Sequence, residues 1–163
     1  MKTIPIVNWH DLESNRDKFL EDLRHAFAEC GFLILTNAPG FDDEFQQRAF
    51  REVRGFFDAP LDVKNTASIV NSPYIRGYSL ATPGDSGRGQ VVEGFQYGFE
   101  EDPVCAHDDE SYPIHERFFR GPNTWPQSET IPGFRPLLEE LNHNYHSLTL
   151  ELGELVVESL GED

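Results

Sequence analysis

The chain has 163 residues, of which 38% are hydrophobic and 12% aromatic, a composition typical of a globular protein with a substantial core. Its formal net charge of −16, from 13 basic and 29 acidic residues, argues against nucleic-acid or anionic-membrane partners. The start, MKTIPIVNWH, lacks the apolar stretch of a signal peptide, and no apolar run is long enough to span a bilayer. The two cysteines indicate no disulfide framework, so we expect a reduced, soluble, cytoplasmic protein.

The first 31 residues predict a strand followed by a helix. Ile4–Val7 is typical of a short strand, and Asp11 or Ser14 can cap the helix that follows. Ser14 with Asp17 approximates a capping box. Apolar residues then recur at helical spacing, so one helix face should be buried. Gly31 should end this helix, because glycine adopts the left-handed conformation that closes a last helical turn.

The four residues after Gly31, Phe32-Leu33-Ile34-Leu35, form a short continuous apolar run. Such a run predicts a strand that is buried on both faces and therefore needs neighbours on both sides. A second helix should begin at Asp42 or Asp43 and carry one apolar face to Phe57. Ala59-Pro60-Leu61 should open a short helical segment, because proline suits a first helical turn.

Two alternating segments, 72–80 (SPYIRGYSL) and 91–98 (VVEGFQYG), predict a β-hairpin. The loop between them, 83–90, contains three glycines that superficially suggest a phosphate-binding loop. They do not open a helix after a buried strand, and no Gly-Lys-Ser/Thr follows, so we interpret them as loop glycines. These glycines are Gly84, Gly87 and Gly89.

The last third of the chain predicts an acidic surface segment and then a long helix. Residues 100–116 hold seven acidic residues and no lysine or arginine, and an irregular stretch, GPNTWP, follows at 121–126. The final helix should run from Phe134 towards Leu160, about 40 Å at 1.5 Å per residue. Its apolar stripe is long enough that the preceding elements are not expected to cover all of it.

Several of these fragments together resemble the N-terminal region of the isopenicillin N synthase-like iron(II)/2-oxoglutarate-dependent dioxygenases. The order and spacing fit over essentially the whole chain, and GPNTWP followed by PGFR is the most specific pair. The resemblance implies an α+β fold over one domain, residues 1–163, with a long C-terminal helix. The fragments are IPIVNW, ECGFLILTNAPG, FFDAPLDVKN, RGYSL, VVEGFQYG, GPNTWP and PGFRPLLEELNHNYHSL.

In this family the chemistry lies on a double-stranded β-helix, or jelly roll, that follows the long helix. That core carries a His-x-Asp pair, a distal His and an Arg-x-Ser, and the two histidines and one carboxylate leave iron positions open for co-substrate and oxygen. The chain stops where this core would begin, so we expect the core to be missing and no catalytic residue or metal ligand to be present. The resemblance implies iron(II) and 2-oxoglutarate as cofactors of the intact enzyme, although some relatives omit 2-oxoglutarate.

Two histidine patterns within the chain partly match that missing site. His107-Asp108-Asp109 spells His-x-Asp, but it lies in the acidic segment, and no Arg-x-Ser occurs anywhere in the chain. His143 and His146 are three residues apart on the last helix, a spacing that can hold a metal, yet no nearby side chain completes a set. We interpret both patterns as coincidental.

The hairpin supplies the candidate binding residues, because the resemblance places it near the mouth of the substrate pocket. Arg76 and Tyr78, in RGYSL, are the predicted substrate-binding residues, since arginine can hold a carboxylate through two parallel hydrogen bonds. The alternative is that the aromatic side chains fill the core and Arg76 pairs with an acidic neighbour. Trp125 is expected to pack and not to contact a ligand.

Two hypotheses for the whole chain remain open at this point. The first is the N-terminal half of an oxidoreductase that acts on a small organic substrate, inactive by itself. The second is a non-catalytic, stand-alone module that binds a partner, or another copy of itself, through uncovered apolar surface.

Overall fold

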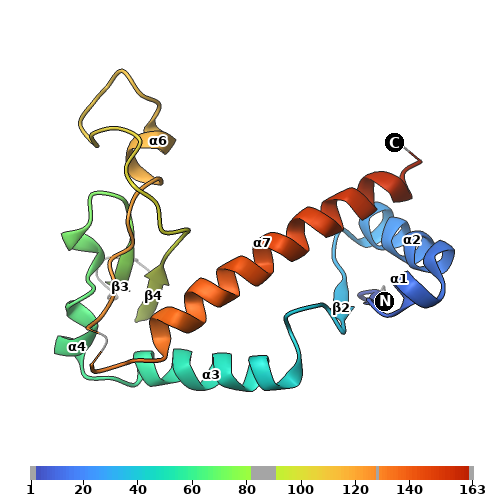
Figure 1. Cartoon of the computed structure of the whole chain (residues 1–163), viewed down its shortest axis with the longest axis horizontal. Coiled ribbons are helices and arrows are strands. Elements are labelled where there is room, and N and C mark those ends of the chain that lie inside the picture. The colour runs from blue at the N-terminus through green and yellow to red at the C-terminus, as the bar shows by residue number, and fades with distance from the viewer. Residues whose placement is uncertain (1–2, 82–90, 128, 162–163) are drawn as a thin grey trace. The chain divides into compact units, whose positions relative to one another are not determined.

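The computed structural model describes residues 3–81, 91–127 and 129–161, and Figure 1 shows its helices and short strands. Contacts divide the chain into two compact units. Unit 1 comprises Met1–Arg48 and His143–Asp163, and unit 2 comprises Ala49–Asn142. The combination of helices with a parallel strand pair and an antiparallel one confirms the predicted α+β class.

Unit 1 contains a parallel pair of strands. Strand β1 (Ile6–Asn8) pairs with strand β2 (Ile34–Thr36), and Val7 lies opposite Leu35. The connection between the strands is helical, as a parallel pair requires a long crossover. It consists of α1 (Asp11–Ser14), α2 (Arg16–His25) and a π-helix (Ala26–Cys30).

The helical crossover ends at the predicted residue but begins at a different one. Gly31 has a φ of 75°, in the left-handed region, and its N–H donates to the Ala26 carbonyl, 2.9 Å away, so this prediction is confirmed. The predicted caps of α2 are wrong. The capping side chain is Asn15, whose Oδ1 accepts a hydrogen bond from the Lys18 backbone N–H at 3.3 Å.

The residues predicted to cap α2 instead belong to a short helix of their own. Asp11 and Ser14 are the two ends of α1, so both precede the cap position. The Asp11 carboxylate accepts a hydrogen bond from Lys18 Nζ at 3.1 Å, and Ser14 Oγ donates to the His10 carbonyl at 3.0 Å. The capping box of Ser14 with Asp17 is therefore also wrong.

The strand after Gly31 is less buried than its apolar sequence predicts. Phe32 is 72% exposed and Ile34 48% exposed, whereas Leu33 and Leu35 pack against the unit 1 core. The prediction of burial on both faces is therefore wrong for the described residues. The physical reason is that the core side chains of the described unit 1 helices reach one face of this two-stranded sheet.

The core cluster of unit 1 that the described residues form is small, with four buried members. Figure 1 shows α2 beside the C-terminal end of α7 (Phe134–Ser159), and the two helices meet around this core. Trp9 packs edge-on against one of its members, Phe19, with ring centroids 5.8 Å apart. The core side chains are Val7, Phe19, Leu23 and Leu155.

Helix α3 (Asp43–Phe57) begins as predicted. The carboxylate of Asp42 accepts a hydrogen bond from the Phe45 backbone N–H at 2.8 Å, which caps the helix. In unit 2, α4 (Leu61–Asn65) follows Pro60, as the sequence predicts, and a 3₁₀ helix (Ile69–Asn71) leads towards the hairpin.

The hairpin is confirmed, although its first strand begins later than predicted. Strand β3 (Gly77–Ala81) pairs antiparallel with β4 (Val92–Gln96), so that Tyr78 lies opposite Phe95. Ile75 has a φ of 53°, and this left-handed conformation excludes a continuous strand from residue 72. The predicted loop and its three glycines lie outside the described residues.

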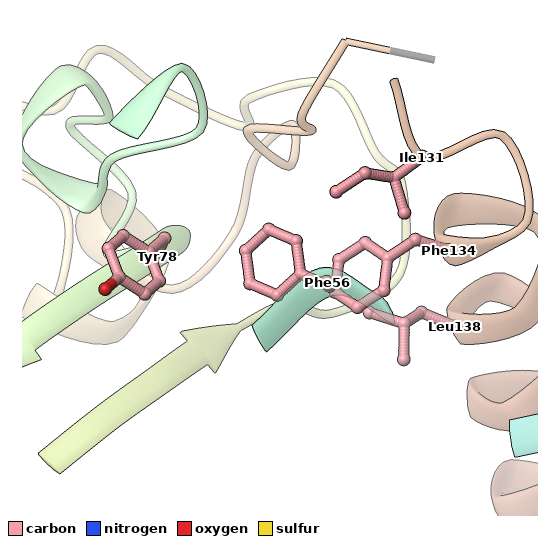
Figure 2. Packing of buried hydrophobic residues seen from close by; sticks show 5 residues of the cluster. All are labelled: Phe56, Tyr78, Ile131, Phe134 and Leu138. Atoms are coloured by element: carbon pink, nitrogen blue, oxygen red, sulfur yellow. The ribbon is translucent and has the colours of Figure 1, made fainter. Parts of the chain in front are cut away.

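Aromatic rings dominate the core of unit 2. Figure 2 shows Phe56 and Phe134 side by side, and their rings stack with centroids 4.3 Å apart. Phe95 meets both rings edge-on, at 5.2 Å and 5.0 Å. The buried members of this cluster are Phe56, Tyr78, Ile131, Phe134 and Leu138.

The C-terminal part of the chain contains two further helices. Helix α6 (Ile114–Phe118) begins within the acidic segment, and α7 begins and ends close to the predicted positions, before Gly161. The predicted apolar stripe of α7 is covered in part: Leu137 and Leu155 are buried, whereas Tyr145 is exposed. None of the helices in the described ranges has the length and apolar character needed to cross a membrane.

Candidate functional site

Tyr78, one of the two predicted binding residues, is part of the unit 2 core. Its side chain is 1% exposed, and in Figure 2 its hydroxyl points away from the other four labelled side chains. That hydroxyl donates a 2.6 Å hydrogen bond to Glu93 Oε1, on the facing strand. The polar end of Tyr78 is therefore already occupied in this chain.

A buried lysine completes this polar cluster. Lys64, on α4, is 7% exposed, its Nζ donates to the Phe57 carbonyl at 3.0 Å, and it forms an ion pair with the carboxylate of Glu93. The same Nζ lies 5.5 Å from the centroid of the Tyr78 ring. Three elements, α4, β3 and β4, are thus joined through one carboxylate. We call Lys64, Tyr78 and Glu93 the buried polar cluster.

The electrostatics of the buried polar cluster favour an ionised carboxylate beside a neutral phenol at neutral pH. The hydrogen bond from Lys64, followed by that from Tyr78, lowers the pKa of Glu93. Burial, and then the hydrogen bond to Glu93, raise the pKa of Tyr78 to about 12. Tyr78 is therefore a neutral donor and Glu93 an ionised acceptor. That Tyr78 contacts substrate stays a prediction.

Arg76, the other predicted binding residue, has a hydrogen-bond donor that no described residue accepts from. Its Nη2 donates to the backbone carbonyl of Phe119. Its Nε is buried and has no hydrogen-bond partner among the described residues. A buried donor without an acceptor costs about 1–3 kcal/mol, so this guanidinium is a site at which an added acceptor is favourable. The alternative pairing with an acidic neighbour is not found among the described residues, where the contact of Arg76 is with this carbonyl.

The GPNTWP stretch closes the end of the hairpin, which the sequence alone did not indicate. Asn123 pairs with the backbone of Gly98: the Gly98 N–H donates to Asn123 Oδ1, and Asn123 Nδ2 donates to the Gly98 carbonyl, both at 2.9 Å. Trp125 stacks on Phe95 with centroids 5.8 Å apart, which agrees with its predicted packing role.

Glu100 joins this stretch to the segment that leaves β4. Its carboxylate accepts hydrogen bonds from Trp125 Nε1 at 2.8 Å and from Asn123 Nδ2 at 3.2 Å. Burial alone would raise the pKa of Glu100, but these hydrogen bonds outweigh burial and lower it. In the sequence, the only hint of these contacts is that Asn123 and Trp125 are side chains with hydrogen-bond donors in an irregular stretch. Their shared partner, Glu100, lies more than 20 residues earlier and could not be predicted from the sequence.

The described residues do not fit an iron site. They contain no grouping of three or more His, Cys, Asp or Glu side chains that could hold a metal ion. In the pattern formed by His107 and Asp109 the aspartate is engaged locally, because its Oδ1 accepts hydrogen bonds from Ser111 N–H at 3.0 Å and Ser111 Oγ at 2.6 Å. His143 and His146, both on α7, are both exposed and lie outside the buried core.

Comparison with known families decides the relationship. The model of the family described as "non-haem dioxygenase in morphine synthesis N-terminal" matches residues 4–128, about three quarters of the chain. The chain belongs to this family. The resemblance seen in the sequence is thereby confirmed.

Curated relatives of this non-haem dioxygenase family member are 2-oxoglutarate-dependent dioxygenases. One from Gibberella zeae is 28% identical over 97% of this chain and 41% of its own length. The dioxygenase traH of Penicillium crustosum is 30% identical over 98% of this chain and 49% of its own length. The chain therefore spans less than half the length of these relatives.

A solved structure supports the fold assignment. A full-length Neurospora crassa protein, crystallised in complex with alpha-KG, matches 98% of this chain and 48% of its own chain, with a TM-score of 0.74 and 20% identity. At this identity the likeness concerns the fold. The chain therefore has the fold of about half of that Neurospora crassa protein.

Proposed function

We propose that this chain is the N-terminal part of an iron(II)- and 2-oxoglutarate-dependent oxygenase that oxidises a small organic substrate. The observation that carries this proposal is the match of residues 4–128 to an N-terminal dioxygenase family. Curated relatives that are 2-oxoglutarate-dependent dioxygenases of about twice this length support it. The jelly-roll core with its His-x-Asp, distal His and Arg-x-Ser would lie outside these 163 residues.

The donor sets support a division of labour between the two parts. The described residues fit no metal site, and no Arg-x-Ser occurs in the sequence, so iron and 2-oxoglutarate would be held by the other part. The contribution of this chain would be to bind and orient the substrate. The Neurospora crassa protein of the same fold has also been crystallised with thymine, which is a small organic molecule of the kind we envisage.

Within this chain we propose Arg76 as the substrate-binding residue. Its side chain carries a permanent positive charge and a buried Nε without an acceptor among the described residues, which suits a carboxylate or another acidic oxygen of the substrate. Tyr78 would act through Arg76 and not by contacting the substrate, because its hydroxyl is bonded to Glu93 and its ring is in the core. Tyr78 would then hold β3, and with it Arg76, in place.

The first test is the reaction of the chain alone. We expect no succinate above the no-protein control when residues 1–163 are incubated with iron(II), ascorbate, 2-oxoglutarate and candidate substrates. Metal-dependent turnover would contradict the division of labour. The transcript should be read past the codon for Asp163, where an in-frame His-x-Asp, distal His and Arg-x-Ser are expected.

The second test concerns Arg76 in an enzyme that contains the complete core. Arg76→Ala should raise the KM for substrate by about tenfold or more, because a charge-assisted hydrogen bond is lost, while Tm changes little. Arg120→Ala is the matched control, since this exposed arginine pairs with Glu101 at 2.9 Å. A fall of many degrees in Tm at unchanged KM would make Arg76 structural.

A stand-alone binding module is the second candidate, favoured by one observation. Apolar side chains of the two-stranded sheet of unit 1 and its flank are exposed, including Ile6, Phe32 and Ile34. Such a surface suits a protein partner. A transcript without the dioxygenase motifs, together with a monodisperse chain that melts cooperatively, would favour this candidate.

A further inference from the structure

Gly98 lies directly against the guanidinium of Arg76. A Cβ built on Gly98 would be 2.7 Å from Arg76 Nη2, 3.2 Å from Cζ and 3.3 Å from Nε. All three distances are shorter than ordinary van der Waals contact. Any side chain larger than hydrogen at this position would therefore displace the guanidinium.

The need for glycine here comes from this contact and not from the backbone. The φ of Gly98 lies outside the positive range that favours glycine, so an alanine could adopt the same backbone conformation. The backbone N–H and carbonyl of Gly98 are both held by Asn123, through two hydrogen bonds of 2.9 Å. These two hydrogen bonds therefore fix the Gly98 backbone, and with it the place where a Cβ would lie.

The guanidinium is also held by the segment that leads to Asn123. The Phe119 carbonyl accepts the hydrogen bond from Nη2, and Phe119 precedes Asn123 by four residues. The guanidinium thus bonds to a carbonyl and lies against a glycine whose missing side chain leaves it room. Its buried Nε remains without an acceptor among the described residues.

We propose that Gly98 is a positioning residue for Arg76: the space left by its missing side chain holds the guanidinium where it can receive an acidic group of the substrate. This inference rests on the proposed substrate-binding role of Arg76. Gly98 itself contacts no reacting atom. Asn123 supports the arrangement by holding the Gly98 backbone in place.

The experiment compares Gly98→Ala with Gly94→Ala in the 163-residue chain. Gly94 lies on β4, and a Cβ there would meet Ser79 Oγ at 3.3 Å and Gln96 Nε2 at 3.7 Å instead of Arg76. The readout is the Arg76 Nε–H signal in ¹⁵N spectra, assigned with Arg76→Lys. Gly98→Ala should shift this signal and speed its exchange with water by about tenfold or more, because a buried N–H becomes exposed. Gly94→Ala should change neither.

A cycle of variants keeps the inference falsifiable if Gly98→Ala lowers stability. Because the clash is with the end of the Arg76 side chain, Gly98→Ala should cost less Tm in the Arg76→Ala background than in the unaltered chain. An equal loss in both backgrounds would overturn the inference. So would an Arg76 Nε–H signal that Gly98→Ala leaves unchanged.

Titration with benzoate, a simple carboxylate probe, separates this inference from the proposed function. Binding that Arg76→Ala and Gly98→Ala each weaken about tenfold or more, and that Gly94→Ala leaves unchanged, supports both. Binding that Arg76→Ala weakens but Gly98→Ala does not would overturn the role of Gly98 alone. If benzoate does not bind, or binds equally well to Arg76→Ala, the result counts against the role of Arg76. The Arg76 Nε–H signal and the cycle of variants then decide whether Gly98 positions Arg76.

Discussion

The two units of this chain cover their small sheets in different ways. In unit 2 the antiparallel hairpin is joined to its surroundings by rings, by the buried polar cluster and by the hydrogen bonds of Asn123. In unit 1 the parallel strands β1 and β2 have core side chains on one face, and Phe32 and Ile34 are exposed. A parallel pair usually has both faces covered, whereas an antiparallel one tolerates a solvated face.

This difference has a functional meaning. Unit 2 contains the candidate binding residue Arg76, whose buried Nε has no hydrogen-bond partner among the described residues. Unit 1 presents exposed apolar surface, which is typical of a surface that another part of an oxygenase or a second protein covers.

The aromatic core should make unit 2 very sensitive to loss of a ring. Phe56→Ala should lower the free energy of unfolding by about 3–5 kcal/mol, because it empties a fully buried position that contacts several other rings. Phe50→Ala, on the same helix but 77% exposed, is the control and should change stability little. Urea unfolding followed by fluorescence measures both. Equal effects would mean that the core is elsewhere.

The exposed sheet of unit 1 should make the isolated chain associate with itself. The charge of −16 opposes association, but its repulsion is screened beyond about 8 Å at physiological salt, so sedimentation across a salt series should show assembly growing with salt. Phe32→Asp should reverse this, since burying one phenylalanine contributes about 1.5–3 kcal/mol. Phe50→Asp is the control. A monodisperse monomer at every salt concentration, with no binding of a hydrophobic dye, would contradict the prediction.

The buried polar cluster should give unit 2 an acid-sensitive contribution to stability. The pKa of Glu93 is lowered in the folded chain from 4.5. Its ionised form therefore stabilises the fold above that value, and this stabilisation is lost as pH falls through the lower, folded pKa.

Glu93→Gln removes the charge that Lys64 faces, and at neutral pH it should cost about 1–3 kcal/mol. The lower part of this range is expected, because the Glu93 side chain is 32% exposed. The variant should also lose stability less steeply than the unaltered chain below pH 4.5. Denaturant unfolding at pH 7 and at intervals through the acid range measures both effects. Parallel pH profiles would show that Glu93 is not responsible.

The cap of α2 should give the smallest effect. Asn15→Ala should cost about 1 kcal/mol, because the Lys18 backbone N–H loses its acceptor. Ser14→Ala, one residue earlier, removes no cap and should cost less. A larger loss for Ser14→Ala than for Asn15→Ala in thermal unfolding would restore the cap that the sequence predicted.

Local signals in the sequence were sufficient where structure depends on neighbours within a few residues. Four local features are found as predicted: the end of the first helix at Gly31, the start of the second helix at Asp42 or Asp43, the helix after Pro60, and the hairpin, whose first strand begins later than predicted. The first three follow from a backbone conformation or a hydrogen bond that involves residues close in sequence, and the hairpin follows from two alternating segments joined by one loop. The family resemblance also rested on such short fragments.

Only the tertiary structure decided which side chains are buried and what they bind. Lys64 pairs with a carboxylate 29 residues away, and Asn123 with a backbone 25 residues away, distances at which periodicity carries no information. The apolar run from Phe32 predicted burial that depends on surrounding elements, and the described helices of unit 1 reach one face of it.

Arg76 and Tyr78 are close neighbours in sequence but differ in their surroundings. The tyrosine is buried in a cluster of rings that comes from α3, the hairpin and α7. The arginine lies against Gly98, and its Nε keeps a hydrogen to donate. Arg76 directly precedes β3 and Tyr78 lies within it, but only the packing of distant segments decides which of the two keeps an unused donor.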